Sequence, residues 1–435
     1  MSAAAGTPAA VVVECDVATG IPTIAAPRAG IPALVLIRVF TEPIAMLNIT
    51  LPGPGLSAAE LERAIVAETE PLLRERFEAC GLAWTGELPL DGVVAPRTPA
   101  FLESREHVLR DGPAMTVAIC THDRPESLAR ALRSVCTQSY ERLQVLVIDN
   151  APSDSRAREL VSAFAAEHAV EYALERRPGL SWARNRAIEL ARSEIIAWVD
   201  DDEYCDPWWA SEIARGFVEV PAADGVTGVV VPSELETPSQ LMFEEYGSVR
   251  RQRGFNRAIF SPATRREQSP LYPLPPFGIG ANMALRRSAL ERIGGFDCAL
   301  GAGTVSRTAE DTAALSAILM AGGTLVYQPT AIVHHSNRRE EDVLRDLLVG
   351  HGRGLGAFYT SMLVREPSCV TELLALAPQA LRDQFSPSGR RLGRLDEGFP
   401  RELLWANRVG LLQGPFVYAS ARVQARRLRR MPSAP

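Results

Sequence analysis

Four acidic residues in a row stand at the end of an apolar run, and this stretch constrains the fold of the chain most strongly. Residues 195–199 are all apolar and include three β-branched side chains, which predicts a strand buried on both faces. Asp200, Asp201, Asp202 and Glu203 follow directly. Carboxylates about 5 Å apart repel by roughly 3 kcal/mol at an effective dielectric of about 20, so their convergence at a strand end is typical of a divalent cation site. The alternative is an acidic turn in open water, where the repulsion falls below about 1 kcal/mol.

Length and composition predict a soluble globular chain of two or three domains, because 435 residues carry ordinary apolar and charged fractions. The net charge of −6 argues against a general nucleic-acid binder. The 7 cysteines are scattered and form no CxxC pair, which favours a reducing compartment and excludes a typical structural zinc site. The sequence shows neither an 18-residue apolar run nor the pattern of a signal peptide, so the expected location is the cytoplasm.

Residues 1–112 are expected to form a small N-terminal accessory α/β domain. Two strands, at 33–40 and 44–51, are separated by a short hairpin-like connection, and Ser57 is placed to cap a helix that follows. These residues contain no cluster of catalytic side chains, so we expect either partner or acceptor contacts or a purely structural role. Residues 104–113 are polar, end in Asp-Gly-Pro, and are predicted to be a linker.

From residue 113 to 337 the pattern alternates between strands and helices. Apolar strands are predicted at 116–120, 143–148 and 170–174, with helical spacing between them. Such alternation predicts an open, mostly parallel sheet that binds ligands at the carboxyl ends of its strands. Polar side chains stand at those ends: Thr121, Asp123 and Arg124 after one strand, Asp149 after the next, and Asp200 to Asp202 after a later one.

A further helix is predicted to begin near residue 181, with Ser181 as its N-cap. Arg184 and Arg186 lie in its first turns, where backbone donors and positive charge together suit a phosphate. Taken singly, each arginine is more often a solvated surface residue. Their position just before the acidic strand end favours a joint phosphate and metal site.

Several of these segments, in this order and at this spacing, resemble the signature of glycosyltransferase family 2. The resemblance covers residues 115–337, about half of the chain, and implies the GT-A fold, which is Rossmann-like with a mostly parallel central sheet. It also implies a nucleotide-sugar donor and inversion with a divalent metal, Mg²⁺ or Mn²⁺. The matching segments are 117–125, 147–154, 179–185, 199–202, 277–284, 293–297 and 310–311.

The resemblance assigns the donor-binding residues by position. Asp149 matches the carboxylate that contacts the nucleobase. Thr121 and Arg124 match the loop on the nucleotide side, and Arg184 matches the arginine near the base or the pyrophosphate. Asp201 is the middle residue of the acidic motif and is assigned to the same donor site.

The metal site is assigned in the same way. Asp200 and Asp202 match the outer members of the DxD motif, with Asp202 as the direct metal ligand. His335, or failing it His334, resembles the place where some relatives supply a further ligand, although a histidine after a strand is usually structural.

Asp311 matches the general base of the family, and Glu310 is its neighbour. An acceptor hydroxyl must lose its proton as it attacks the sugar, and a carboxylate within about 2.6–3.2 Å can take it. The alternative is that both acids only complement the N-terminus of a helix.

Residues 338–435 are expected to form a helical C-terminal region, with helices at 342–362, 370–382 and 400–430. The last helix mixes arginines with apolar side chains, which is compatible with peripheral contact with an anionic membrane, although such a segment is more often an ordinary helix with a charged tail. The residues that suggest this contact are Phe416, Val417, Tyr418, Val423 and Leu428 with Arg422, Arg426, Arg427, Arg429 and Arg430.

The sequence thus predicts a metal-dependent inverting glycosyltransferase that uses a UDP-, GDP- or dTDP-sugar and an acceptor hydroxyl on a glycan, a lipid-linked sugar or a small molecule. A sugar-phosphate nucleotidyltransferase shares the sheet and the metal carboxylates, but usually has a glycine- and arginine-rich loop after its first strand. An inactive scaffold that binds nucleotide or glycan is a third possibility. Self-association into a homo-oligomer stays open.

Overall fold

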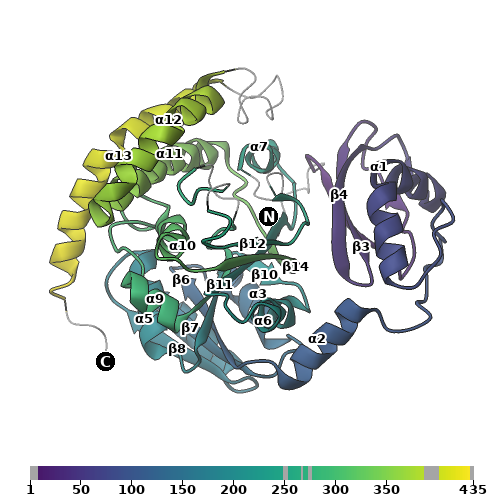
Figure 1. The fold of residues 1–435 in the computed structure, drawn as a ribbon, viewed down its shortest axis with the longest axis horizontal. Helices are drawn as coiled ribbons and strands as arrows, with labels where there is room; N and C mark the ends of the chain where they lie inside the picture. Colours follow the sequence, from purple (N-terminus) through teal and green to yellow (C-terminus); the bar gives the residue numbers. More distant parts are fainter. Residues whose placement is uncertain (1–7, 248–252, 266–267, 273–276, 387–400, 432–435) are drawn as a thin grey trace.

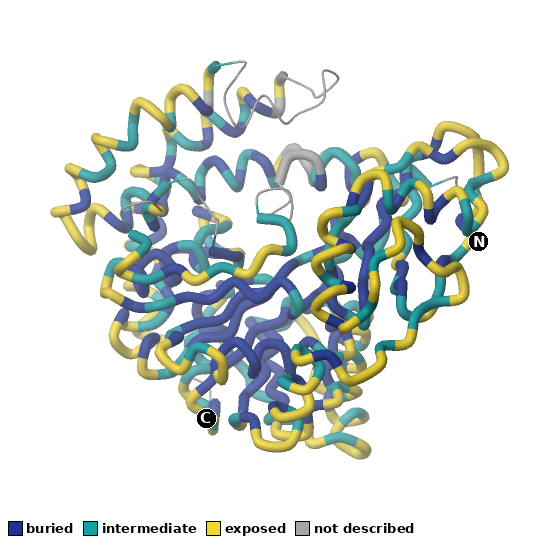
Figure 2. Tube along the Cα trace, turned by 45° about the vertical axis from the view of Figure 1, so that its right-hand side comes forward, coloured by how far each residue is buried: buried dark blue, intermediate teal, exposed yellow. Residues whose placement is uncertain are grey.

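The computed structural model describes residues 8–247, 253–265, 268–272, 277–386 and 401–431. The N-terminal strands and α1 lie on one side of the central sheet, and the last helices lie on the other (Figure 1). The strands of the central sheet are buried along most of their length, whereas exposed residues concentrate in the outer helices and loops (Figure 2). The core therefore lies around the central sheet.

The N-terminal part is a small α/β unit. Its main sheet has the order β1-β3-β4, and the β3–β4 pair is antiparallel, which confirms the predicted hairpin. Ser57 and Glu60 form a reciprocal capping box at the start of α1, which confirms the predicted helix start. The elements are β1 (Val11–Asp16), β2 (Ile24–Ala25), β3 (Pro32–Val39), β4 (Glu42–Thr50), β5 (Gly55–Leu56) and α1 (Ala58–Ala79).

The predicted linker at 104–113 is wrong, because most of it belongs to the helix α2 (Ala100–Asp111). Arg105 and Val108 form the buried side of this helix. The polar composition that suggested a linker reflects an ion pair between helices, in which Arg105 binds Glu212 with a distance of 2.6 Å between Nε and Oε1. The helix ends at Gly112, just before Pro113.

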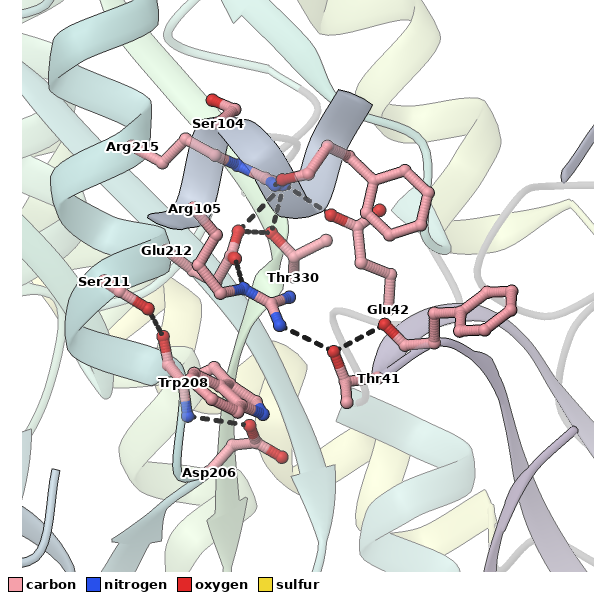
Figure 3. A network of polar contacts seen from close by, with 12 residues as sticks. Thr41, Glu42, Ser104, Arg105, Asp206, Trp208, Ser211, Glu212, Arg215 and Thr330 are labelled. Atoms are coloured by element: carbon pink, nitrogen blue, oxygen red, sulfur yellow. Dashed lines mark hydrogen bonds and ion pairs between the residues drawn. The ribbon is translucent and has the colours of Figure 1, made fainter. Parts of the chain in front are cut away.

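A buried polar network joins the N-terminal unit to the central domain (Figure 3). Glu212 on α6 (Trp209–Glu219) accepts hydrogen bonds from Arg105 of α2 and from Thr330 of β14. Arg215 of α6 pairs with Glu212 at 2.8 Å and with Glu42 of β4 at 2.7 Å. These contacts fix β4 and α2 against the same face of the central domain.

The central sheet has nine strands in the order β10-β14-β11-β13-β9-β6-β7-β8, with β12 paired to β14. Strands β6 to β9 run parallel, and β13 and β10 run antiparallel to their neighbours. This confirms the predicted α/β class with a mostly parallel sheet. The strands are β6 (Met115–Thr121), β7 (Leu143–Asn150), β8 (Val170–Glu175), β9 (Ile195–Asp200), β10 (Glu203–Cys205), β11 (Gly225–Pro232), β12 (Ala258–Phe260), β13 (Asn282–Arg286) and β14 (Leu325–His335).

Helices cover both faces of this sheet, because two separate apolar cores form on its two sides. Leu128 and Ile213, from α3 and α6, belong to one core. Ala187, Leu290 and Ile318, from α5, α9 and α10, belong to the other. The remaining helices of this domain are α3 (Pro125–Cys136), α4 (Arg156–Phe164), α5 (Leu180–Leu190), α7 (Pro238–Gly247), α9 (Arg287–Ile293) and α10 (Glu310–Met320).

Two local predictions in this domain are corrected. The N-cap of α5 is Gly179, not Ser181, because the chain there adopts φ 128°, which favours glycine. Ser181 instead donates its hydroxyl to the carbonyl of Leu300 at 2.8 Å. The apolar stretches 324–327 and 331–333, which the sequence pattern predicts as two short strands, form one strand, β14, with a register shift after Gln328, where Pro329 interrupts the pairing with β11.

The C-terminal region is helical, as predicted. Glycines let α11 and α13 cross closely: a Cβ atom on Gly352 would lie 2.1 Å from the carbonyl oxygen of Asn407, and one on Gly414 would lie 2.2 Å from Gly356. In the described part of the chain, no helix has the length and apolar character needed to cross a bilayer. Two further stretches of the sequence, the arginine-rich segment 250–266 and the polar segment 386–391, lie partly outside the described residues. The helices are α11 (Glu341–Arg365), the 3₁₀ turn η1 (Pro367–Cys369), α12 (Val370–Phe385) and α13 (Arg401–Leu428).

Candidate active site

Strand register brings the predicted donor residues to one edge of the sheet. Thr121 at the end of β6 pairs with Asp149 of β7, and Cys120 pairs with Asp200 at the end of β9. These positions follow one another across three neighbouring strands, because β6 lies between β7 and β9. The alternating pattern in the sequence therefore places these side chains at the carboxyl edge, as expected for an α/β sheet.

Asp201 is the buried member of the acidic motif and faces the loop after β6. It accepts a hydrogen bond from the Thr121 hydroxyl at 2.7 Å and one from Arg124 at 3.0 Å. Arg124 also donates to Asp202 at 3.1 Å. The Arg124 guanidinium thus connects the loop after β6 to both Asp201 and Asp202.

Asp202 is surrounded by cations. Besides Arg124, the Nη2 atom of Arg338 lies 3.3 Å from Oδ2, and the Nε2 atom of His335 lies 3.5 Å from Oδ1. Burial alone would raise the pKa of Asp202, but these three groups outweigh it and lower that pKa to about 2. Asn337 holds the other ring nitrogen of His335, with 2.8 Å between Nδ1 and the amide oxygen.

The structure separates the two histidines. His334 is buried and stacks on Tyr204 with ring centroids 4.5 Å apart, and its Nε2 atom lies 3.5 Å from a carboxylate oxygen of Glu14. Burial lowers the pKa of His334, although the negative charge of Glu14 acts to raise it. For His335, burial acts in the same direction, but the contact with Asp202 outweighs it and raises the pKa. Only His335 therefore faces the acidic motif.

Arg184 links the acidic motif to the start of α10. It is buried and binds Glu310 at 2.8 Å and Asp200 at 3.4 Å. Burial, together with the neighbouring acids Asp201 and Asp202, raises the pKa of Asp200 to about 6, although Arg184 opposes this. Arg186, in contrast, pairs with a glutamate of its own helix and does not join this cluster.

Asp311 sits at the N-terminus of α10 and is held by backbone donors. Its Oδ2 atom accepts the N–H of Gly280 at 2.5 Å, and its Oδ1 atom accepts the N–H of Thr312 at 2.6 Å. A Cβ atom on Gly280 would lie 2.5 Å from the Cβ of Asp311, so this approach requires glycine. Asp311 is half-buried, whereas Glu310 is buried. Burial raises the pKa of Glu310 to about 7, with Arg184 opposing and Asp311 adding to the rise.

Asp149 lies deeper at the same edge and is fully buried. Its Oδ2 atom accepts the hydroxyl of Tyr172 at 2.8 Å, whereas Oδ1 has no hydrogen-bond partner in the described structure. Burial is the largest cause that raises the pKa of Asp149. An unsatisfied buried oxygen of this kind is suited to a donor from a ligand.

Sequence reasoning missed several residues of this site. Asn337 and Arg338 follow His335 after Ser336, and this run of polar residues after a strand was the available signal. Gly280 was assigned only to a glycine-rich segment, and Tyr172 left no signal in the sequence. Glu203 is buried and accepts the backbone N–H of Asp200 at 3.1 Å; burial raises its pKa well above the ordinary value.

Much of this site lies in a segment that is similar to known proteins. Residues 116–294 match the family model described as glycosyl transferase family 2. The chain is 24% identical over 191 residues to the glucosyl-dolichyl phosphate glucuronosyltransferase of Haloferax volcanii, covering 43% of this chain and 57% of that protein. It is 28% identical over 231 residues to the succinoglycan biosynthesis protein ExoM of Rhizobium meliloti, covering 50% and 65%. The chain therefore spans less than two thirds of the length of either relative.

Among solved structures, the chain overlaps with the mannosyltransferase PcManGT of Pyrobaculum calidifontis, a complex with GDP-Man and Mn²⁺. The TM-score is 0.44 and the identity is 17%, with 85% of this chain and 88% of that chain covered. The matched sequence segment 116–294 contains β6 to β9 and the acidic motif, as the resemblance predicts. Over residues 116–294 the chain is thus similar to glycosyl transferase family 2.

Proposed function

We propose that the chain is a metal-dependent, inverting glycosyltransferase that moves a sugar from a nucleotide-sugar donor to an acceptor hydroxyl. The observation that carries the proposal is the contact of Arg184 with both Asp200 and Glu310. This arginine joins the acids at the end of β9 to the acids at the start of α10, which lie more than 100 residues apart in the chain. One site then contains both the groups that hold a diphosphate and the group that accepts a proton.

The donor set fits a divalent cation that also binds substrate phosphates. The described residues contain no group of three or more His, Cys, Asp and Glu side chains arranged to hold a metal. Asp202 and His335 supply one carboxylate and one imidazole 3.5 Å apart. Mg²⁺ is commonly held by one or two carboxylates together with substrate phosphates, so a small protein ligand set is in line with this use. When bound there, the cation acts as a Lewis acid that offsets charge on the leaving diphosphate.

The nucleotide side of the site is supported by Asp149. Its free Oδ1 atom can accept an N–H of a nucleobase, while Tyr172 holds the other oxygen in place. Arg124 and Arg338 bring two guanidinium groups to the acidic motif. Near a diphosphate the same cations offset negative charge, because guanidinium groups bind phosphate oxygens well.

Asp311 is proposed as the general base, because it is the more accessible of the two acids at the start of α10. Glu310 is buried against Arg184 and serves to position that arginine. The acceptor oxygen forms a bond to the anomeric carbon as the bond from that carbon to the diphosphate breaks. The acceptor proton passes to a carboxylate oxygen of Asp311, and a single displacement inverts the anomeric centre.

The test measures the leaving group and the effect of Asp311. A thermal-shift panel of UDP-, GDP- and dTDP-sugars with and without Mn²⁺ identifies the donor, because ligand binding raises apparent stability. The proposed reaction then releases nucleoside diphosphate; release of pyrophosphate would indicate a nucleotidyltransferase, and release of neither would indicate a scaffold. Asp311→Asn should lower transfer by about 10²- to 10⁴-fold and preserve the donor-dependent thermal shift.

Asp154→Asn is the matched control, because Asp154 is exposed and accepts its hydrogen bonds from Arg156, two residues further along the chain. This variant should transfer sugar at the wild-type rate. Near-normal turnover by Asp311→Asn would show that another group accepts the proton.

A further inference from the structure

Exposed apolar side chains are concentrated in the last part of the chain. Among the described residues, 12 of the 19 large hydrophobic side chains that are exposed lie between 363 and 431. A patch of this extent normally marks an interaction site, whereas single exposed hydrophobic residues need no explanation. The surface of α12 and α13 is therefore the strongest indication of a second binding partner.

The helix α13 carries an apolar outer stripe, formed by Trp405, Val409, Leu412, Phe416 and Val423. These residues follow at intervals of four, three, four and seven, so they share one face of the helix. Leu412 is 78% exposed and Phe416 is 80% exposed. The helix forms the outer edge of the molecule, and α11 lies behind it (Figure 1).

The opposite face of α13 packs against the protein. Gly410 and Gly414 contact α11, and Tyr418 is buried, with its hydroxyl donated to Asp297 at 2.7 Å. The sequence grouped Tyr418 and Leu428 with the apolar side chains of this helix, but neither belongs to the outer stripe. Tyr418 points inward, and Leu428 is only half-exposed and packs against a small buried cluster.

Positive charge collects at the end of the same helix. Residues 403–435 contain six arginines and no acidic residue, although the whole chain has a net charge of −6. Arg422, Arg426 and Arg429 line a cavity of about 310 Å³ together with Arg365 and one acid, Asp297. Within the described part of the chain, Arg422, Arg426 and Arg429 form no ion pair with a carboxylate. Arg427 continues the line of the outer stripe by one turn beyond Val423.

We propose that α13 docks this protein onto an anionic phospholipid surface. The outer stripe enters the interface between headgroups and acyl chains. Trp405 lies at the level of the headgroups, where tryptophan is enriched, and the arginines contact lipid phosphates. A second copy of the chain is the less suitable partner, because Glu402 is the only acid on α13 and could not neutralise the arginines. Lipid phosphates supply the missing anions. The proposal is independent of the transfer reaction.

The first test is flotation of the full chain with vesicles of phosphatidylcholine alone or of phosphatidylcholine with phosphatidylglycerol. The wild type should float with the anionic vesicles and stay unbound with the neutral ones. The double variant Leu412→Glu/Phe416→Glu should lose flotation, because it places two carboxylates in the contact face. Val94→Glu is the matched control: Val94 is 89% exposed and lies in the N-terminal unit, so this variant should float like the wild type.

The second test addresses charge. Arg426→Gln and Arg427→Gln should each weaken vesicle binding by about fivefold, since a cation near an anionic membrane contributes about 1 kcal/mol. Added salt should weaken binding of the wild type as well. Circular dichroism of each variant shows whether it remains folded.

Three results would overturn the proposal. The first is failure of the folded wild-type chain to bind anionic vesicles at low salt. The second is equal binding to neutral and anionic vesicles. The third is a dimer, measured by light scattering, that the Leu412→Glu/Phe416→Glu variant converts to a monomer, since this would make the outer stripe an interface between copies. A folded wild-type chain that transfers sugar but does not bind anionic vesicles would refute this inference and leave the proposed reaction standing.

Discussion

Replacing Glu212 by glutamine should strongly destabilise the junction between the N-terminal unit and the central domain. Glu212 is fully buried, with its two oxygens at 2.6 Å from Arg105 Nε and 2.8 Å from Arg215 Nη2 (Figure 3). It also accepts hydrogen bonds from Thr330 and Gln328. Each of these four groups contacts the Glu212 carboxylate as a hydrogen-bond donor.

The magnitude follows from the charge and the hydrogen-bond pattern. Glutamine keeps one acceptor oxygen but turns an NH₂ group toward the donors that the second oxygen had satisfied. The positive charges of Arg105 and Arg215 then stay buried, with Glu42 at 2.7 Å and the partly exposed Glu219 at 3.8 Å from Arg215 as the remaining acids. Breaking a buried ion pair by removing one partner costs about 3–5 kcal/mol. We expect Glu212→Gln to lower the free energy of unfolding by that amount.

The assay is urea denaturation followed by tryptophan fluorescence, because Trp208 and Trp209 lie at the start of the same helix. Glu219→Gln is the matched control: Glu219 is on α6 as well and lies 3.8 Å from Arg215, but its side chain is 31% exposed and its closer partners, Arg257 and Ser104, are near the surface. The control should lose at most about 1 kcal/mol. Equal losses for both variants would refute the view that the buried network fixes the two units together.

Two further predictions concern the candidate site. His335→Ala should raise the Mn²⁺ concentration needed for donor binding by about tenfold or more, whereas His334→Ala should lower thermal stability and leave that concentration unchanged, because only His335 contacts Asp202. The measurement is a metal titration followed by thermal shift. If it gave the reverse result, His334 and not His335 would be the metal ligand. Glu310 has a pKa of about 7 in the folded chain, above its ordinary value of about 4.3. Between these two pH values the folded state binds more protons than the unfolded state. The free energy of unfolding should therefore fall as pH rises from about 5 to about 7. Glu310→Gln should reduce this slope in denaturation measured across that range.

The presence of the parallel strands and the position of the site edge could be predicted because local patterns determine them. Buried parallel strands appear as continuous apolar runs, and their polar ends fall on the same edge whatever the exact pairing. Thr121, Asp149 and Asp200 were placed correctly for this reason. The helix α2 was missed because Arg105 is buried by an ion pair, and a buried arginine cannot be distinguished from a solvated one in the sequence.

Contacts that depend on residues far apart in the chain could not be predicted in the same way. Arg338 reaches Asp202 from beyond the end of β14, and Gly280 reaches Asp311 from the loop before β13. Neither contact has a periodic signal, because Arg338 and Gly280 lie in irregular structure. Only the packing of the complete domain brings these groups within hydrogen-bond distance.

The choice between His334 and His335 is set by strand register. In the antiparallel β10–β14 pair, Tyr204 lies opposite His334 and Glu203 lies opposite His335. Directly opposed residues point to the same face of a sheet, so Tyr204 and His334 stack on one face while His335 turns to the other, toward Asp202. A shift of this pairing by one residue would exchange the two histidines. Because β10 has only 3 residues, its sequence is too short to specify that register, and the preference for His335 follows from how β10 and β14 pair in the folded domain.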